Sequence, residues 1–177
     1  VTVHLNTTVK DAVGEVGRFL TTLQTAGAAE QTIEHGVVIL ATGGREARTD
    51  SYQYGRHPAV ITQQELALRM SDKTFDPRSL NSVVMIQCVG SREEPRNYCS
   101  RVCCPTALKH ALKLLKRHPG LNLYILYRDI MTTGFSESFY TAARQAGVVF
   151  LAYEPHRKPT VQPPASDKAP LTVRTLD

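Results

Sequence analysis

The sequence predicts an α/β protein whose main part is a Rossmann-like unit with a parallel sheet at about residues 78–154. Apolar, strand-like segments alternate there with amphipathic helical segments, at the spacing of βαβ units. Turn residues separate the segments. A chain of 177 residues with 42% hydrophobic and 21% charged residues is of ordinary globular composition. It can bury one core, or two small subdomains.

The βαβ unit is predicted from five segments in order. Strands are expected at 83–87, 121–127 and 148–152, and helices at about 105–117 and 136–145. Pro119-Gly120 ends the first helix, and Gly147 stands where a C′ glycine would end the second. Right-handed crossovers would place the strands in parallel, with their carboxyl ends at one edge of the sheet.

The flanking regions predict an incomplete β layer. Residues 1–48 contain strand-like segments at 1–5, about 15–24 and about 33–41, of which the third includes a nearly continuous apolar run at 37–41. Residues 155–177 form a Pro-rich segment followed by a strand-like end at 171–174. We expect strands from both ends of the chain to form one separate β layer, as if the sequence were cut through a sheet.

Residues 49–77 are predicted to form a polar linker with one short helix. Thr62 and Glu65 have the spacing of a capping box, which predicts a helix from there to about Met70. Pro77 then interrupts the chain before the βαβ unit.

The net charge of +5 is concentrated on the helix at 105–117 and just after it. The basic residues are Lys109, His110, Lys113, Lys116, Arg117 and His118. They lie opposite an apolar stripe, so we interpret them as a solvated face and predict no nucleic-acid binding. The longest apolar run is too short to span a bilayer, and no secretory signal is visible. We therefore expect a cytoplasmic protein without direct membrane insertion.

All four cysteines occur in one short region with the pattern C-x10-C-x3-C-C: Cys88, Cys99, Cys103 and Cys104. Cys88 follows the first strand of the βαβ unit, and the adjacent pair precedes Pro105, which suits the first helical position. A helix N-terminus favours negative charge. Four soft thiolate ligands therefore predict a cubane iron–sulfur cluster.

The spacing alone leaves three alternatives open. A structural zinc site usually shows two short C-x2–4-C pairs, and an adjacent Cys-Cys pair suits a single tetrahedral ion poorly. A disulfide framework would imply a secreted chain. A redox-active thiol pair would more often be C-x-x-C, which is absent.

The cysteine region resembles the heterodisulfide reductase A-subunit family, which includes related subunits of quinone-interacting membrane-bound oxidoreductase complexes. The resemblance is strongest over 84–92 and 98–104, with further support from 54–62, 126–130 and Gly134-Phe135. It extends over most of residues 35–153. It implies the second nucleotide-type domain of a thioredoxin-reductase-like flavoprotein core, in which the four cysteines hold a [4Fe-4S] cluster.

The same resemblance implies an electron-transfer oxidoreductase that uses FAD. Thr42, Gly43 and Gly44 look like the motif that ends a strand beside FAD in the full-length parent, although a simple strand-to-loop turn would have the same pattern. We expect the isolated chain to lack FAD and to be inactive. In the parent, electrons would pass between FAD and the cluster, and on to other subunits of a heterodisulfide reductase-like or quinone-interacting complex.

The alternative function is an NAD(P)H-dependent flavin disulfide oxidoreductase domain with a structural metal site. Such domains carry G-x-G-x-x-G after the first strand, to cradle a pyrophosphate. Here Gly90 stands alone at that place, followed by the cysteine loop. Asp129 lies too far along the chain to match the ribose-binding acid of that fingerprint. We therefore predict that the chain binds neither NADH nor NADPH.

Overall fold

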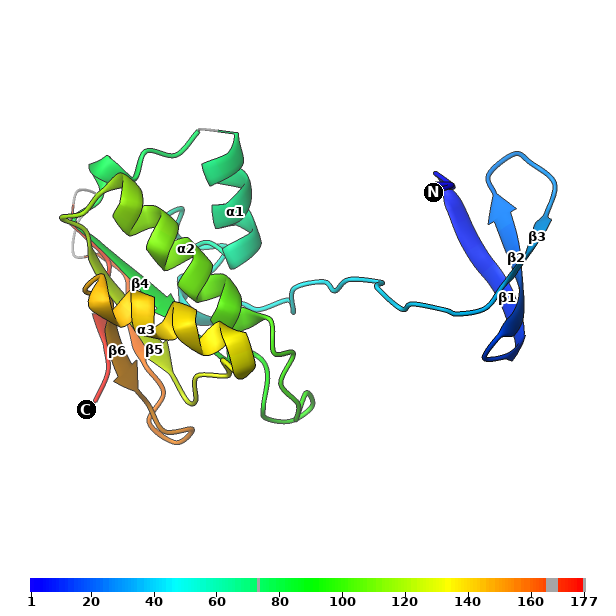
Figure 1. Ribbon diagram of the computed structural model, residues 1–177. Helices are drawn as coiled ribbons and strands as arrows, with labels where there is room; N and C mark the ends of the chain where they lie inside the picture. Colours follow the sequence, from blue (N-terminus) through cyan, green and yellow to red (C-terminus); the bar gives the residue numbers. More distant parts are fainter. Residues whose placement is uncertain (73, 165–168, 177) are drawn as a thin grey trace. The chain divides into compact units, whose positions relative to one another are not determined.

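The computed structural model describes residues 1–72, 74–164 and 169–176. The chain divides into two compact units, Val1–Arg45 and Glu46–Asp177, and each is described by itself. Figure 1 shows an antiparallel β unit and a mixed α/β unit.

The N-terminal unit is a three-stranded antiparallel sheet in the order β1-β2-β3. Its strands are β1 (Thr7–Glu15), β2 (Arg18–Thr25) and β3 (Gln31–His35). A two-residue turn joins β1 to β2, and Glu15 pairs with Arg18 at its base. Gly14 has φ +114°, and a Cβ there would collide with the carbonyl oxygen of Arg18. The close approach of the two strands therefore requires glycine at this position.

Two of the strand predictions for this unit are wrong. The strand predicted at 1–5 is absent: residues 1–4 have no regular structure, Leu5 lies in a turn, and β1 begins only at Thr7, where pairing with Thr25 starts. The apolar run at 37–41 lies outside any strand, and Ile39 and Leu40 are each 85% exposed. An apolar run forms a buried strand only where another strand pairs with its backbone and other side chains cover it. The N-terminal unit supplies neither for this segment.

The α/β unit contains the predicted parallel sheet. Strands β4 (Ser82–Ile86), β5 (Asn122–Tyr127) and β6 (Val149–Ala152) lie side by side in that order. Both neighbouring pairs are parallel, with Met85 beside Ile125 and Ile125 beside Phe150. The prediction of a Rossmann-like parallel unit is confirmed.

Two helices, α2 (Cys103–Arg117) and α3 (Glu137–Gln145), connect these strands and lie on the same face of the sheet (Figure 1). This follows from the sequential strand order, because successive right-handed crossovers place their helices on one side. Leu108 and Leu114 of α2 meet Leu123 and Ile125 of β5 in a buried core. Helix α3 ends as predicted at Gly147, which has φ +93°.

A short helix and a small hairpin complete this unit. Helix α1 (Gln63–Ser71) begins with the predicted capping box, in which Thr62 and Glu65 each accept the other's backbone N–H. The C-terminal strand β8 (Thr172–Arg174) pairs antiparallel with β7 (Thr160–Gln162). The expected layer shared with the N-terminal strands is therefore wrong, and the small sheets are separate. Pairing with a strand close in sequence costs less loop-closure entropy.

The structure also describes three short 3-10 helices, η1 (Ser51–Gln53), η2 (Pro77–Ser79) and η3 (Gly134–Ser136). Among the helices of the described residues, not one combines the length and the apolar composition that crossing a membrane requires.

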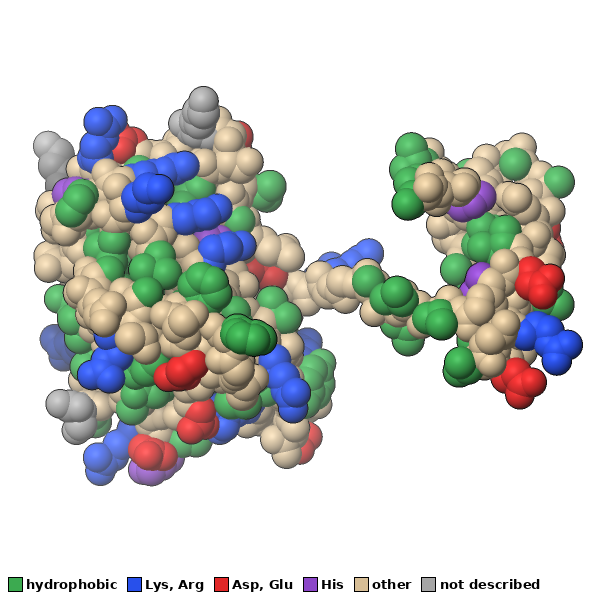
Figure 2. Space-filling view, viewed as in Figure 1, with side chains coloured by type: hydrophobic (Ala, Val, Ile, Leu, Met, Phe, Trp, Pro, Cys, Tyr) green, Lys and Arg blue, Asp and Glu red, His purple; other side chains and the backbone are tan. Residues whose placement is uncertain are grey.

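Lys and Arg side chains gather on the outer surface of α2 (Figure 2). Lys109, Lys113 and Lys116 are exposed there, as the sequence predicted. His110 is the exception, because only 1% of it is exposed and its ring contacts Gln63 of α1. Its assignment to the solvated face is wrong, since α1 covers this edge of α2.

Candidate metal centre

The first cysteine follows the carboxyl end of β4, where neighbouring contacts fix the backbone. The Gln87 N–H donates to the Leu126 carbonyl of β5 at 2.9 Å. The buried Tyr153 hydroxyl donates to the Gln87 carbonyl at 2.6 Å. Cys88 then leaves the strand with φ +60°, a left-handed conformation that is uncommon outside glycine and frequent at functional sites.

The loop at 88–102 is held by its own backbone. The Arg92 N–H donates to the Arg96 carbonyl at 2.8 Å, and the Tyr98 N–H donates to the same oxygen at 2.8 Å. Gly90, Arg92 and Arg101 have positive φ values, of 66°, 61° and 59°. Such turns point backbone N–H groups out of the usual ladder, where they can bind anions.

One such N–H reaches a cysteine. The Arg101 N–H donates to the Cys99 Sγ at 3.3 Å, and the Ser100 hydroxyl lies 3.4 Å from the Cys103 Sγ. These contacts fix the orientation of the Cys99 and Cys103 side chains within the loop and at the start of α2.

The adjacent cysteine pair occupies the first turn of α2. Cys103 and Cys104 are its first two residues, and Pro105 is the third. The expectation of Pro105 as the first helical residue is wrong, because no residue of the first turn needs its N–H for a helical bond and proline is tolerated throughout it. Successive helical residues point about 100° apart. Cys104 is accordingly buried and Cys103 exposed.

The four thiols are close enough to influence one another. Burial raises the pKa of the Cys104 thiol, and the neighbouring Cys88, Cys103 and Cys99 raise it further, since each thiolate disfavours the next. The Cys104 Sγ also lies 3.7 Å from the Asp129 carbonyl oxygen, at the carboxyl end of β5. A bound cation would offset this mutual repulsion of thiolates.

The donor set fits an iron–sulfur cluster. One thiol follows the end of β4, one lies in the loop at 88–102, and two begin α2. Within the described residues, no three His, Cys, Asp or Glu side chains are grouped tightly enough to ligate a single metal ion. A cubane takes one thiolate at each of its irons, so its ligands do not need to surround one ion. Assignment of the four cysteines as cluster ligands remains a prediction.

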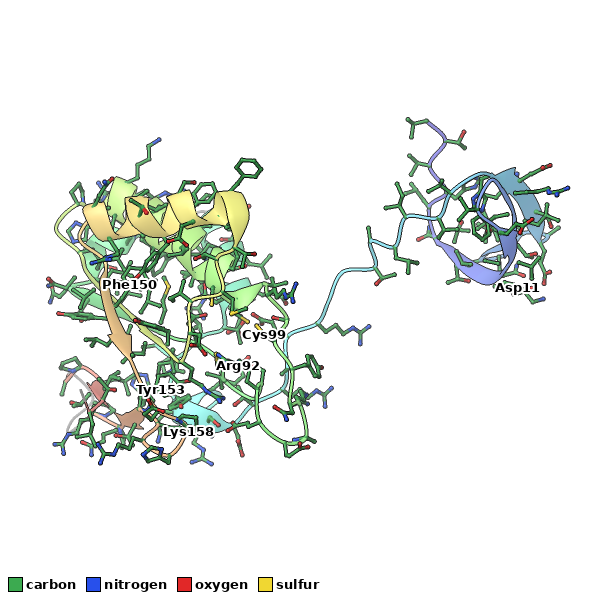
Figure 3. The ribbon with its side chains drawn as sticks, turned by 60° about the horizontal axis from the view of Figure 1, so that its bottom comes forward. Asp11, Arg92, Cys99, Phe150, Tyr153 and Lys158 are labelled. Atoms are coloured by element: carbon green, nitrogen blue, oxygen red, sulfur yellow. The ribbon has the colours of Figure 1, made fainter. Side chains whose placement is uncertain are left out.

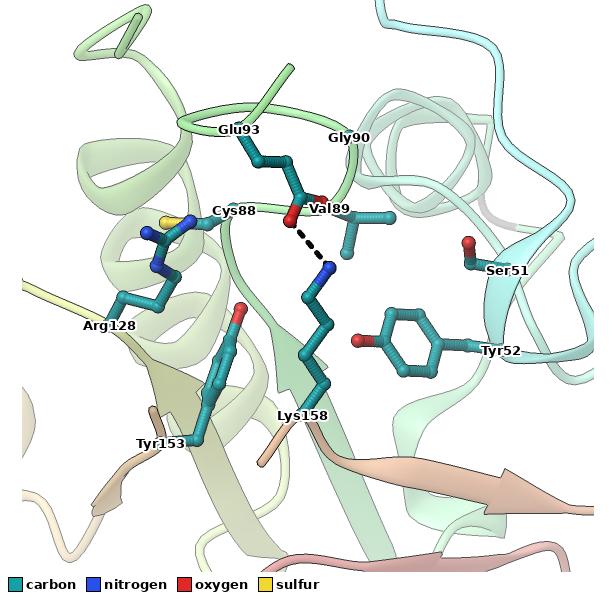
Figure 4. A pocket seen from close by; sticks show the side chains of 9 residues that line it. All are labelled: Ser51, Tyr52, Cys88, Val89, Gly90, Glu93, Arg128, Tyr153 and Lys158. Carbon is teal, nitrogen blue, oxygen red and sulfur yellow. Dashed lines mark hydrogen bonds and ion pairs between the residues drawn. The ribbon is translucent and has the colours of Figure 1, made fainter. Parts of the chain in front are cut away.

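A small polar cavity of about 50 Å³ lies beside Cys88 (Figure 4). Its lining residues come from distant parts of the chain: Ser51, Tyr52, Cys88, Val89, Gly90, Glu93, Arg128, Tyr153 and Lys158. Lys158 and Glu93 form an ion pair of 2.5 Å across it. Burial, followed by the charge of Glu93, raises the pKa of the Tyr52 phenol. Sequence reasoning missed Tyr153, Arg128 and Lys158, because no local spacing relates them to Cys88.

The residues predicted to lie beside FAD belong to the other unit. Thr42, Gly43 and Gly44 follow the exposed apolar run, in a segment without regular structure. Gly43 has φ +70°, so the turn itself requires glycine or a residue that tolerates the left-handed region. Their role toward FAD remains a prediction.

The fold and the cysteines together define a class: an α/β protein with a thiol-rich centre at the carboxyl edge of a parallel sheet. No family model matches the chain. It is 37% identical over 161 residues to the A-subunit of the ferredoxin:CoB-CoM heterodisulfide reductase of Methanosarcina acetivorans, covering 68% of this chain and 20% of that protein.

Two further relatives are also A-subunits of heterodisulfide reductases. The iron-sulfur A-subunit of the CoB--CoM heterodisulfide reductase of Methanocaldococcus jannaschii is 36% identical over 143 residues, 71% of this chain and 22% of that protein. The A-subunit of the H(2)/formate:CoB-CoM heterodisulfide,ferredoxin reductase of Methanococcus maripaludis is 37% identical over 143 residues, with the same two shares. The chain belongs to the heterodisulfide reductase A-subunit family, and the resemblance seen in the sequence is confirmed. It spans about a fifth of the length of these curated relatives.

Proposed function

We propose that this chain is the cluster-bearing part of an FAD- and iron–sulfur-dependent electron-transfer oxidoreductase of the heterodisulfide reductase A type. Cys88, Cys99, Cys103 and Cys104 would hold a [4Fe-4S] cluster. The observation that carries the proposal is that Cys88 follows β4 and Cys103 and Cys104 begin α2 at the carboxyl edge of the β4-β5-β6 sheet, with Cys99 in the loop between them. Open α/β sheets place their ligands at this edge.

The chain's own residues would position and stabilise the centre. Cys103 and Cys104 stand in the first turn of α2, where the free N–H groups and the helix dipole would stabilise a bound anionic cluster. The Arg101 N–H and the Ser100 hydroxyl lie against the Cys99 and Cys103 sulfurs. When bound, the cluster would supply one-electron transfer. The name of one relative, which describes it as an iron-sulfur subunit, supports this cofactor.

In the full-length parent, Thr42, Gly43 and Gly44 would lie on the FAD side. The exposed apolar run at 37–41 supports this, because it is a strand-like segment without a covering partner in the described N-terminal unit. Partners would be the other subunits of a heterodisulfide reductase-like or quinone-interacting complex, since the relatives are themselves named as subunits.

Anaerobic reconstitution with iron and sulfide tests the cluster. We expect about four irons per chain and a paramagnetic signal after reduction. Replacing any of the four cysteines by serine should lower the iron content, most strongly at Cys103 or Cys104. Ser82→Ala, at the opposite end of β4, serves as the control. A wild type that takes up no iron, or four serine variants that bind iron equally well, would contradict the assignment.

Calorimetric titration with NADH and NADPH tests the alternative of a nicotinamide-dependent domain. Gly90 is the only glycine of the loop at 88–102, so a pyrophosphate finds no Gly-rich turn for close backbone approach. We expect no binding with a dissociation constant in the low micromolar range. Such binding, together with one zinc per chain, would support the alternative function instead.

A further inference from the structure

One arginine of the cysteine loop is tied to two strand ends of the sheet. The Arg92 Nη2 lies 2.6 Å from the Asp129 carboxylate, which follows β5. Its Nη1 lies 4.0 Å from the Cys88 Sγ, which follows β4. Figure 3 shows Arg92 in the same loop region as Cys99. The guanidinium thus stands between the first cysteine and the acid that follows the next strand.

The backbone of Arg92 is held as firmly as its side chain. Its N–H donates to the Arg96 carbonyl, and its carbonyl accepts the Arg128 Nη1 at 3.0 Å. The Arg92 side chain is 26% exposed, whereas that of Asp129 is 60% exposed. Water therefore screens the acid more than the arginine. The Asp129 carbonyl in turn faces the Cys104 sulfur, so the ion pair spans two of the four cysteines.

A fixed positive charge beside a redox centre has a defined effect. Reduction adds one negative charge to the cluster, and a nearby cation stabilises that charge more than it stabilises the oxidised form. A nearby carboxylate has the opposite effect. The two members of this ion pair should therefore shift the reduction potential in opposite directions.

We propose that Arg92 is a positioning residue that orients Cys88 and raises the reduction potential of the cluster, and that Asp129 both holds Arg92 and partly offsets its charge. This inference rests on the proposed cluster. It assigns to one arginine a role that the other loop arginines do not share, because the described contacts tie only the Arg92 guanidinium to a cysteine sulfur and a strand-end acid.

The test is a redox titration of the reconstituted 177-residue chain, followed by electron paramagnetic resonance. Arg92→Gln should lower the potential by the equivalent of about tenfold in the one-electron equilibrium constant, which is about 59 mV. Asp129→Asn should raise it by a smaller amount. The double variant removes both charges, so its reduction potential should return toward the wild-type value. Arg92→Lys keeps the positive charge but loses the planar guanidinium with its paired N–H donors. Its reduction potential should lie between those of wild type and Arg92→Gln.

Arg117→Gln is the matched control, because it removes the same charge from an exposed side chain at the far end of α2 from the cysteines. It should shift the potential much less than Arg92→Gln. Equal shifts from the two arginines, or shifts of Arg92→Gln and Asp129→Asn that are absent or have the same sign, would overturn the inference. If Arg92→Gln does not retain the cluster, the Asp129→Asn variant alone tests the inference. A raised reduction potential in that variant supports it, and a lowered or unchanged potential overturns it. A wild type without iron instead refutes the proposed function, and with it this inference.

Discussion

The two units of the chain differ in how much apolar surface they bury. In the described part of the N-terminal unit, Leu23 is the one buried hydrophobic residue, while Val9 and Val13 of β1 are 65% and 53% exposed. The α/β unit has a continuous core in which Leu108, Leu114 and Leu123 are at most 1% exposed. A three-stranded sheet without a covered face gains little hydrophobic stabilisation, whereas helices packed on a sheet gain much more.

This difference in buried apolar surface explains why the candidate metal centre lies in the α/β unit, where packed elements can hold ligands in fixed positions. Cys88 follows β4, and Cys103 and Cys104 begin α2; both elements pack into the core of the α/β unit. Elements fixed by a packed core hold ligands in place more accurately than loops do. Thr42, Gly43 and Gly44 lie in a segment of the other unit that has no such support. The comparison predicts that stability resides in residues 46–177.

The largest expected effect is in the core of the α/β unit. Leu108→Ala should lower the free energy of unfolding by about 3 kcal/mol, because it removes a buried side chain between α2 and the sheet. Val9→Ala in β1 should change it by less than about 0.5 kcal/mol. All 7 tyrosines lie in residues 46–177, so tyrosine fluorescence during urea unfolding follows this unit, and far-UV circular dichroism follows the strands of the N-terminal unit as well. Equal losses of unfolding free energy from Leu108→Ala and Val9→Ala would contradict the conclusion that stability resides in the α/β unit.

The next effect concerns His110, which joins α1 to α2. Burial, with Lys109 and Lys113 adding repulsion, lowers its pKa to about 4 from the ordinary 6.5. The folded state therefore binds fewer protons than the unfolded state between these values. Stability from this residue is complete above about pH 6.5, and about 2 kcal/mol should be lost as the pH falls to about 5.

Urea unfolding at about pH 7.5 and about pH 5 checks this difference. His110→Gln should remove most of the pH dependence, since Gln63 then faces a side chain that does not titrate. His156→Gln changes an exposed histidine and should leave the pH dependence as in wild type. An unchanged pH dependence in His110→Gln would show that other groups control it.

A smaller effect is expected at the start of α1. Thr62→Ala removes the side-chain oxygen that accepts the Glu65 N–H at 3.2 Å, and should cost about 1 kcal/mol. Thr133 precedes η3 without a side-chain capping bond, so Thr133→Ala should be nearly neutral. Thermal unfolding followed by tyrosine fluorescence measures both. A cost at Thr133 as large as that at Thr62 would mean that the capping box does not stabilise the unit.

The smallest effect should follow from deleting residues 1–45. If the α/β unit carries its own core, its tyrosine-detected unfolding free energy should change by less than about 1 kcal/mol. A larger loss of unfolding free energy would show that the N-terminal unit stabilises the α/β unit. The conclusion that stability resides in residues 46–177 would then be wrong.

The elements of the α/β unit could be predicted because their signals are local. Alternating apolar strands, the amphipathic pattern of α2, the capping box at Thr62 and the glycine at Gly147 each act within a few residues. All of these elements are present in the structure. The N-terminal strands were predicted less well, because the run at 37–41 has the composition of a buried strand but has no strand beside it.

The site was predictable in part for the same reason. The sequence by itself determined which side chains carry thiols, their spacing, and that Cys88 follows a strand while Cys103 and Cys104 lie close to the start of a helix. Only the tertiary structure decided that Cys104 is buried and Cys103 exposed, that α1 covers His110, and that Arg92 meets Asp129, 37 residues further on. Contacts of this kind depend on how strands and helices stack, and the packing of distant segments leaves no periodic signal in the sequence.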